Sequence, residues 1–207
     1  LVDTSVHDEL LGLIKEEVRR MFGDHPLDSE DYGHIVNAKH FARVRGLIDP
    51  DKVVLGGAAR EASLKIEPTI LDGVAPDDAV MQEEIFGPIL PVLTFESLDE
   101  AEAFITDRPT PLALYIFSQD RAVQQRFVRY VPFGGGCVND TIMHLATSHM
   151  GFGGMGASGM GQYHGRESFD TFSHKKSIVN KVTWLDVPFR YAPYASWKHK
   201  FVRMFVH

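Results

Sequence analysis

Two adjacent carboxylates and an aromatic side chain stand together in the stretch MQEEIFGPILPV, as Glu83, Glu84 and Phe86. Gly87 and Pro88 break the chain directly after them, and the apolar run that follows predicts a buried strand fed by this turn. Turns at the ends of strands often present working side chains. Because an ionised carboxylate only accepts hydrogen bonds, one glutamate can bind both hydroxyls of a ribose. The alternative interpretation is a solvated helix end with Phe86 in the core.

The single thiol of the chain, Cys137, is a second candidate for a functional residue, as a catalytic nucleophile. Nucleophilic catalysis requires a thiolate that a neighbouring base or cation activates. Cys137 instead lies in a glycine-flanked apolar segment, GGGCVND, which favours an inert, buried residue. A lone cysteine also excludes a disulfide framework and a cysteine-rich metal site. We therefore assign no catalytic role to Cys137.

Two further patterns resemble functional motifs, but neither predicts a functional site. Gly154–Gly159, GMGASG, matches a dinucleotide-binding fingerprint, but no predicted strand leads into it and no acidic residue waits about 20 residues later. His144 and His149 stand five residues apart without the cysteines or carboxylates that would complete a metal site. We predict structural or channel-lining histidines here, and no metal site.

Two long motifs in this chain resemble signatures of the NAD(P)-dependent aldehyde dehydrogenases, and they occur in the same order. The first is EEIFGP, and the second is the late stretch FGGMGASGMGQYHGRESFDTF at residues 152–172. Its YHGRESFDTFSH continuation is similar to the class 3 and fatty-aldehyde branch. The resemblance extends from Leu1 to about Tyr194. One departure is Gly151, which stands where the family usually has proline. The backbone that leads to Phe152 is therefore expected to be less rigid.

The resemblance implies a three-layer α/β fold and an enzyme that oxidises an aldehyde to a carboxylic acid with NAD or NADP as cofactor. It implies that Glu84 and Phe86 contact the nicotinamide ribose, with Glu83 facing outward. It also implies an aldehyde pocket that is lined by Leu145, Ala146 and Phe152.

In the family, the nucleophilic cysteine, the general base and the oxyanion donor all precede the position of Leu1. We therefore expect the C-terminal part of a longer enzyme, without catalytic residues of its own, inactive alone and partnered by an N-terminal dinucleotide-binding domain. Residues 1–172 would form the catalytic, substrate-binding domain. Residues 173–207 would hold a strand for a homodimer, Ser177–Val182, and a tail. The alternatives are a non-catalytic dimerisation module with the same fold and a related acyl-phosphate reductase.

The composition is that of an ordinary globular protein of 207 residues, with 44% hydrophobic and 24% charged residues. A net charge of −7 argues against a nucleic-acid scaffold.

No apolar run approaches the roughly 20 residues that a membrane span needs. The aromatic tail from Trp184 to Phe205, locally basic at Arg190, Lys198 and Lys200, is expected to be solvated, and membrane contact is unsupported. One cysteine fits a reducing compartment, so we expect a cytoplasmic protein.

The elements that position these residues follow from local patterns. Apolar residues at helical spacing predict a helix over residues 5–22, with Ser5 as its N-cap and Gly23 as its stop. Asn37 is expected to cap a second helix. Pro68 interrupts an apolar strand at 65–71, which predicts an edge strand or a bulge there.

Later segments alternate strongly between strand and helix patterns. Further strands are predicted at residues 53–55, 112–117 and 137–139, and helices after the caps Ser97 and Asp120. This alternation implies right-handed crossovers and a mostly parallel sheet with helices on both faces, which is the α/β class. The glycines crowded into residues 134–165 are expected to pack against a substrate, a cofactor or the rest of the enzyme.

Overall fold

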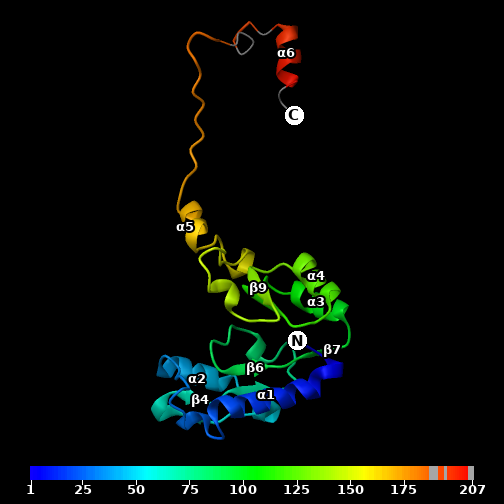
Figure 1. Cartoon of the computed structure of the whole chain (residues 1–207), viewed down its shortest axis with the longest axis vertical. Coiled ribbons are helices and arrows are strands. Elements are labelled where there is room, and N and C mark those ends of the chain that lie inside the picture. The colour runs from blue at the N-terminus through cyan, green and yellow to red at the C-terminus, as the bar shows by residue number, and fades with distance from the viewer. Residues whose placement is uncertain (187–190, 194, 205–207) are drawn as a thin grey trace.

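The computed structural model describes residues 1–186, 191–193 and 195–204. Figure 1 shows two lobes, one containing α1, α2 and β6 and the other containing α3, α4 and β9, with a long tail that leaves the second lobe. Strand β1 (Val2–Asp3) pairs in parallel with β7 (Thr94–Phe95), so the two ends of the first lobe's sequence meet where the chain passes to the second lobe.

The first lobe is built on a three-stranded sheet in the order β2 (Val53–Leu55), β5 (Thr69–Leu71), β6 (Ile89–Pro91). Strand β5 pairs in parallel with β6 and antiparallel with β2. A separate hairpin pairs β3 (Ala59–Arg60) with β4 (Lys65–Ile66).

For the strand predicted over residues 65–71, the edge alternative is wrong in the second half, whereas the bulge alternative corresponds to a register shift in the pairing of β2 with β5, between Val53 and Leu55. Pro68 divides the segment into β4 and β5, and β5 is the central strand, with all three residues buried. Because Pro68 lies just before the ladder, its missing N–H costs no sheet hydrogen bond, and the amide of Thr69 donates to the carbonyl of Pro88 at 2.8 Å. The predicted strand after Pro88 forms as β6, but Leu90 is exposed and only Ile89 is buried in it.

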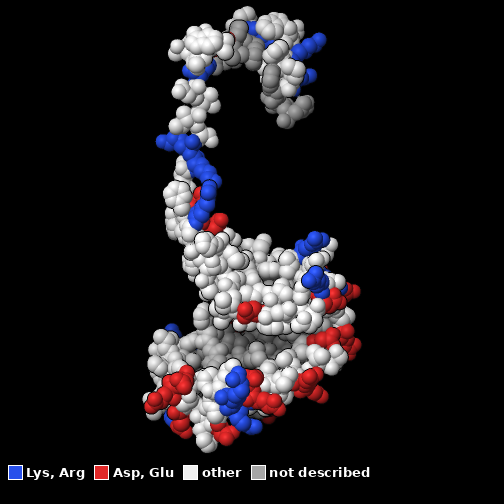
Figure 2. All heavy atoms as spheres, viewed as in Figure 1, with Lys and Arg blue, Asp and Glu red and all other residues white. Residues whose placement is uncertain are grey.

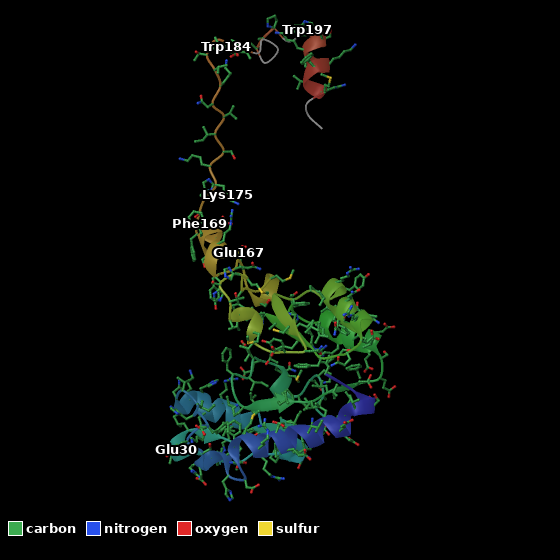
Figure 3. The ribbon with its side chains drawn as sticks, viewed as in Figure 1. Glu30, Glu167, Phe169, Lys175, Trp184 and Trp197 are labelled. Carbon is green, nitrogen blue, oxygen red and sulfur yellow. The ribbon has the colours of Figure 1, made fainter. Side chains whose placement is uncertain are left out.

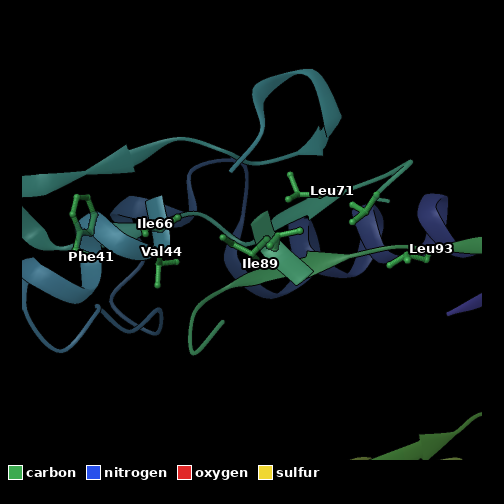
Figure 4. Close-up of a cluster of buried hydrophobic side chains, with 8 residues drawn as sticks. Phe41, Val44, Ile66, Leu71, Ile89 and Leu93 are labelled. Atoms are coloured by element: carbon green, nitrogen blue, oxygen red, sulfur yellow. The ribbon is translucent and has the colours of Figure 1, made fainter. Parts of the chain in front are cut away.

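Helices cover this sheet on both faces. Ile70 packs in a cluster with Leu11 of α1 (His7–Phe22), whereas Leu71 packs in the main core with Phe41 and Val44 of α2 (Ala38–Gly46). Alternate residues of a strand face opposite sides, so β5 serves both layers. Figure 4 shows the main core cluster, which consists of Phe41, Val44, Ile66, Leu71, Val74, Val80, Ile89 and Leu93.

The helix boundaries follow local capping chemistry. Gly23 ends α1 with a φ of 72°, and the side chain of Asn37 accepts a hydrogen bond from the amide of His40, both as predicted. The predicted N-cap Ser5 is wrong: the carboxylate of Asp3 accepts from the amide of Ser5, because a 3-10 turn precedes α1. Such turns occur at Thr4–Val6, Pro26–Asp28, Pro50–Lys52, Glu61–Ser63, Ala79–Met81, Met143–Leu145 and Gly156–Ser158.

The second lobe packs α3 (Leu98–Thr106) and α4 (Arg121–Tyr130) on the parallel pair β8 (Ala113–Ile116) and β9 (Gly135–Val138). Side chains of both helices and of β8 meet in one buried cluster: Ala101, Ile116, Phe127 and Val131. The caps Ser97 and Asp120 each accept a backbone N–H, as predicted. Among the described residues, three of the five strand pairings are parallel, and the α/β class is confirmed.

Beyond the short helix α5 (Gly165–Thr171), the chain leaves the body as an extended, exposed segment and then forms α6 (Ser196–Arg203). Figure 3 shows Lys175, Trp184 and Trp197 along this tail. The predicted strand Ser177–Val182 is extended but unpaired here, and its dimer role stays a prediction. Arg190, Tyr194 and Phe205 lie outside the described residues. Within the described ranges, no helix has the length and apolarity to span a membrane.

The contact between His7 and Asp72 generates a pH prediction. The Nε2 of His7 lies 2.8 Å from Asp72 and its Nδ1 lies 2.8 Å from Asp8, so the start of α1 is tied to the residue after β5. Hydrogen bonds to Asp72 first, and to Asp8 second, raise the pKa of His7. A pKa that is higher in the folded state stabilises the protein fully below about pH 6.5, and the stabilisation is lost as pH rises through the folded value.

We therefore expect His7→Gln to lower the free energy of unfolding more at pH 6 than at pH 8.5, as measured by urea denaturation. His25→Gln, at an exposed histidine, is the matched control and should give the same small difference at both pH values. A His7→Gln effect that does not change between the two pH values would contradict the assignment.

Candidate functional site

The turn between Met81 and Ile89 displays its side chains rather than burying them. Glu84 is exposed, and Phe86 has 72% of its surface exposed. The 3-10 turn before it ends at Met81, so no helix carries the two carboxylates. The alternative interpretation, with a helix end and a core aromatic, is therefore wrong for Phe86 and for the local structure.

Phe86 adopts a left-handed backbone conformation, with a φ of 46°. For a bulky side chain this conformation costs on the order of 1–3 kcal/mol and persists only where the surroundings enforce it. The Nε2 of His40 on α2 lies 2.7 Å from the carbonyl oxygen of Phe86, and thus holds the strained peptide from outside the turn.

Arg43, one helical turn after His40, makes three contacts with the same region. Its Nη1 donates to the Glu83 carboxylate at 2.6 Å, its Nη2 donates to the carbonyl of Ile85, and its Nε lies 3.3 Å from the Nδ1 of His40. Glu83 is exposed, as predicted, but it is not free. Among the described residues Glu84 makes no comparable contact, so the two neighbouring carboxylates differ in their surroundings.

Gly87 completes the attachment of the turn to α2. A Cβ at this position would lie 2.5 Å from Cγ1 and 3.0 Å from Cγ2 of Val44, which is fully buried in the core. Any side chain would therefore push the turn away from the helix. The turn is thus fixed by hydrogen bonds from the His40 and Arg43 side chains to its backbone carbonyls and by close packing at Gly87.

The predicted pocket residues lie in the second lobe. Leu145 is half-buried, Ala146 is exposed, and Phe152 is half-buried in a chain of aromatic contacts. The Phe152 ring centroid lies 5.6 Å from that of His144 and 5.6 Å from that of Tyr163, and its backbone pairs with Tyr163 through two hydrogen bonds. These contacts with His144 and Tyr163 place Phe152 in a fixed orientation.

Cys137 is half-buried rather than buried, and it has a partner. Its Sγ lies 3.6 Å from the Nδ1 of His144, whose side chain is only 6% exposed and also contacts the ring of Tyr115. The sequence spacing of seven residues gives no sign of this pair. The described residues contain no group of three or more His, Cys, Asp or Glu that could hold a metal ion.

Glycines of the glycine-rich segment pack against the chain's own backbone, and the expected contact with a substrate, a cofactor or the rest of the enzyme stays a prediction. A Cβ on Gly153 would lie 2.1 Å from the carbonyl oxygen of Gly161, and one on Gly154 would lie 2.2 Å from that of Ser158. No described strand leads into Gly154–Gly159, and the segment itself contains a 3-10 turn, Gly156–Ser158, rather than the start of an α-helix, so it does not have the strand–turn–helix geometry of a dinucleotide fingerprint. A Cβ on Gly151 would meet the side chains of Gln162 and Glu167, so this position is crowded rather than loose.

The sequence predicted helix α2 but gave no indication that its side chains hold the turn. His40 and Arg43 are 40 or more residues before their partners, and no spacing rule connects them. One usable signal was present: Asn37 fixes the start of α2, and residues three apart share a helix face. An apolar groove of about 380 Å³, between α3, α4 and β8, was also missed, and it is lined by none of the predicted site residues.

The chain thus forms two α/β lobes, and the first presents an exposed carboxylate and an exposed aromatic side chain on a turn that α2 holds. The solved structure of AldH from Staphylococcus aureus, in a substrate-bound state, superimposes on 100% of this chain and 45% of its own, with a TM-score of 0.91 and 49% identity. An indole-3-acetaldehyde dehydrogenase in complex with NAD⁺ matches 86% of this chain and 37% of its own, with a TM-score of 0.76 and 28% identity.

The aldehyde dehydrogenase family model matches residues 1–178. The 4,4'-diaponeurosporen-aldehyde dehydrogenase of Staphylococcus aureus is 50% identical over 99% of this chain and 45% of its own length. The dimeric NADP-preferring aldehyde dehydrogenase of Bos taurus is 44% identical over 86% of this chain and 75% of its own. This chain belongs to the aldehyde dehydrogenase family, and similarity to family 3 members A2 and H1 confirms the class 3 branch. The chain spans 45% of the length of the Staphylococcus aureus relative.

The close packing of Gly87 on Val44 predicts a strong coupling between the two positions. We expect Gly87→Ala to lower the free energy of unfolding by about 1–3 kcal/mol, because the new methyl group overpacks the contact. In a Val44→Ala background, where the opposing methyls are gone, the same change should cost much less. Urea denaturation of the two single variants and the double variant measures the coupling. Additive effects would show that the turn can move off α2 freely.

Proposed function

We propose that this chain is the C-terminal part of an aldehyde dehydrogenase that oxidises an aldehyde to a carboxylic acid with NAD or NADP. Family membership supports the reaction class. The observation that carries the proposal for this chain's own residues is the carboxylate of Glu84, which has no hydrogen-bond or ion-pair partner among the described residues. It stands exposed on a turn whose other carboxylate is already bound by Arg43. The NAD⁺ and NADP in the names of two relatives support a nicotinamide cofactor.

The residues of the turn fit such a cofactor. In the proposed complex, Glu84 accepts hydrogen bonds from both hydroxyls of the nicotinamide ribose. Phe86, exposed beside it, packs against the same part of the cofactor. The bound nicotinamide supplies the hydride acceptor for oxidation of the aldehyde carbon. Glu84 acts by fixing where that acceptor points, and it carries no proton in the reaction.

The remaining chemistry belongs to residues that this chain does not supply. In the proposed enzyme a cysteine thiolate forms a bond to the aldehyde carbonyl, and an activated water releases the acid from the thioester. Leu145, Ala146 and Phe152 line the pocket for the aldehyde substrate. Their support is the fixed orientation of Phe152 against His144 and Tyr163.

We further propose that residues 1–172 form the catalytic domain and residues 173–207 an oligomerisation strand and tail of a cytoplasmic homodimer. The end of α5 at Thr171 supports this boundary, because the chain beyond it leaves the body. Ile178 and Val179 are exposed in the unpaired segment, and an extended apolar segment gains backbone partners by joining a sheet edge. The word dimeric in the name of the Bos taurus relative supports the homodimer.

In the complete enzyme, Glu84→Gln should slow hydride transfer by about ten- to a hundredfold. One acceptor oxygen becomes a donor, and loss of a charged hydrogen-bond acceptor costs roughly 1.5–3 kcal/mol. Single-turnover formation of NADH with saturating aldehyde and NAD measures the rate. The control is Glu16→Gln, at an exposed carboxylate on α1. An unchanged rate in Glu84→Gln would refute the ribose contact.

The isolated chain of residues 1–207 should neither oxidise aldehydes nor bind NAD measurably, because the proposed nucleophile and dinucleotide domain lie elsewhere in the enzyme. Absorbance at 340 nm and equilibrium dialysis with NAD test both points. Cys137→Ser is the informative variant, since Cys137 contacts His144. Aldehyde turnover by the isolated chain that Cys137→Ser abolishes would assign the nucleophile to Cys137 instead.

A further inference from the structure

We propose that His40 and Arg43 of α2 are positioning residues for the cofactor, because they hold the turn that presents Glu84. The inference rests on the proposed role of this turn in binding the nicotinamide ribose. Neither residue contacts the cofactor in this proposal. They fix the peptides on either side of Phe86, and the position of the Glu84 carboxylate follows from that.

The two side chains form one directed hydrogen-bond chain. The Nε–H of Arg43 donates to the Nδ1 of His40, at 3.3 Å, and the Nε2–H of His40 donates to the carbonyl of Phe86, at 2.7 Å. Only the neutral tautomer of His40 with its proton on Nε2 satisfies both contacts. Arg43 therefore selects the tautomer that His40 needs to hold Phe86 in its left-handed conformation.

The guanidinium of Arg43 also distinguishes the two adjacent carboxylates, because it binds that of Glu83 and leaves that of Glu84 unbound. Its Nη1 binds Glu83 and its Nη2 binds the carbonyl of Ile85, so its planar fork is attached both before and after Glu84. A fork of this kind fixes direction as well as distance. With Glu83 held against α2, Glu84 is the carboxylate that remains available to a ligand.

Helix α2 is a rigid base for these contacts. The side chain of Asn37 caps its first turn at 2.8 Å, and Phe41 and Val44 anchor the helix in the main core. Val44 also sets the distance to the turn through its contact with Gly87. Residues of a binding site keep their geometry only when such a second layer locks them. Without it, Phe86 would be free to leave its strained conformation and to carry Glu84 with it.

The test uses Arg43→Met in the complete enzyme, which removes the fork but keeps much of the side-chain volume. We expect the KM for NAD to rise and single-turnover hydride transfer to slow, each by about tenfold, with the KM for the aldehyde unchanged. Arg45→Met is the matched control, because Arg45 is an exposed arginine on the same helix. Arg43→Lys, which keeps the charge but not the fork, should fall between Arg43→Met and the unmodified enzyme.

His40 has its own pair of variants. His40→Phe removes the donor to Phe86, and His40→Gln keeps an amide donor of similar reach, so the rise in the NAD KM should be larger in His40→Phe. Equal effects of the two variants, or an equal rise in the KM values for NAD and aldehyde in Arg43→Met, would overturn the positioning role.

Double variants separate this inference from the proposed function. If Arg43 acts through Glu84, the effect of Arg43→Met on NAD should nearly vanish in a Glu84→Gln background. A tenfold effect of Glu84→Gln with none of Arg43→Met overturns the positioning role and leaves the ribose contact intact. An effect of Arg43→Met with none of Glu84→Gln supports positioning through Phe86 and refutes the role of Glu84. Purely additive effects would assign Arg43 to general stability and overturn the inference.

Discussion

The first lobe depends on a single short strand, β5. Its three residues are hydrogen-bonded on both edges and covered on both faces, so every layer of the lobe touches it. Thr69, the buried polar residue of the strand, donates its hydroxyl to the carbonyl of Glu67 and accepts from the amide of Gly57. A buried hydroxyl with both partners costs little, and it fixes the register of the neighbouring turn. The turn with Glu84 leads directly into β6, and the pairing of β6 with this strand therefore fixes where the turn ends.

Local chemistry was readable from the sequence, and non-local pairing was not. Caps such as Asn37, Ser97 and Asp120 act within three residues, so their types and spacing were sufficient. The central place of β5 depends on partners at residues 53–55 and 89–91, and Pro68 masked it by suggesting an edge. For the site, EEIFGP identified the exposed turn, but the spacing could not show that Arg43 already binds Glu83.

The two lobes differ in how far they expose their polar and ionisable side chains. In the first, helix α2 holds the turn through hydrogen bonds and leaves one carboxylate exposed. In the second, Cys137 and His144 contact each other beneath Tyr115 and Phe152, where aromatic rings cover the imidazole. Exposure, rather than residue type, therefore distinguishes a group that is available to a ligand from one that stabilises its surroundings.

The glycines of the second lobe have a consequence for anyone who labels or extends this protein. A Cβ on Gly134 or Gly136 would lie 2.6 Å or 1.9 Å from carbonyl oxygens of the strand β8 region, so main chain lies directly on main chain there. A fluorophore or an inserted epitope has no room in that layer. Residues 173–186 are exposed and carry lysines away from the acidic body, as Figure 2 shows. The first residues of this segment, before the proposed dimer strand Ser177–Val182, are the place where a reporter group can be attached while both lobes keep their packing.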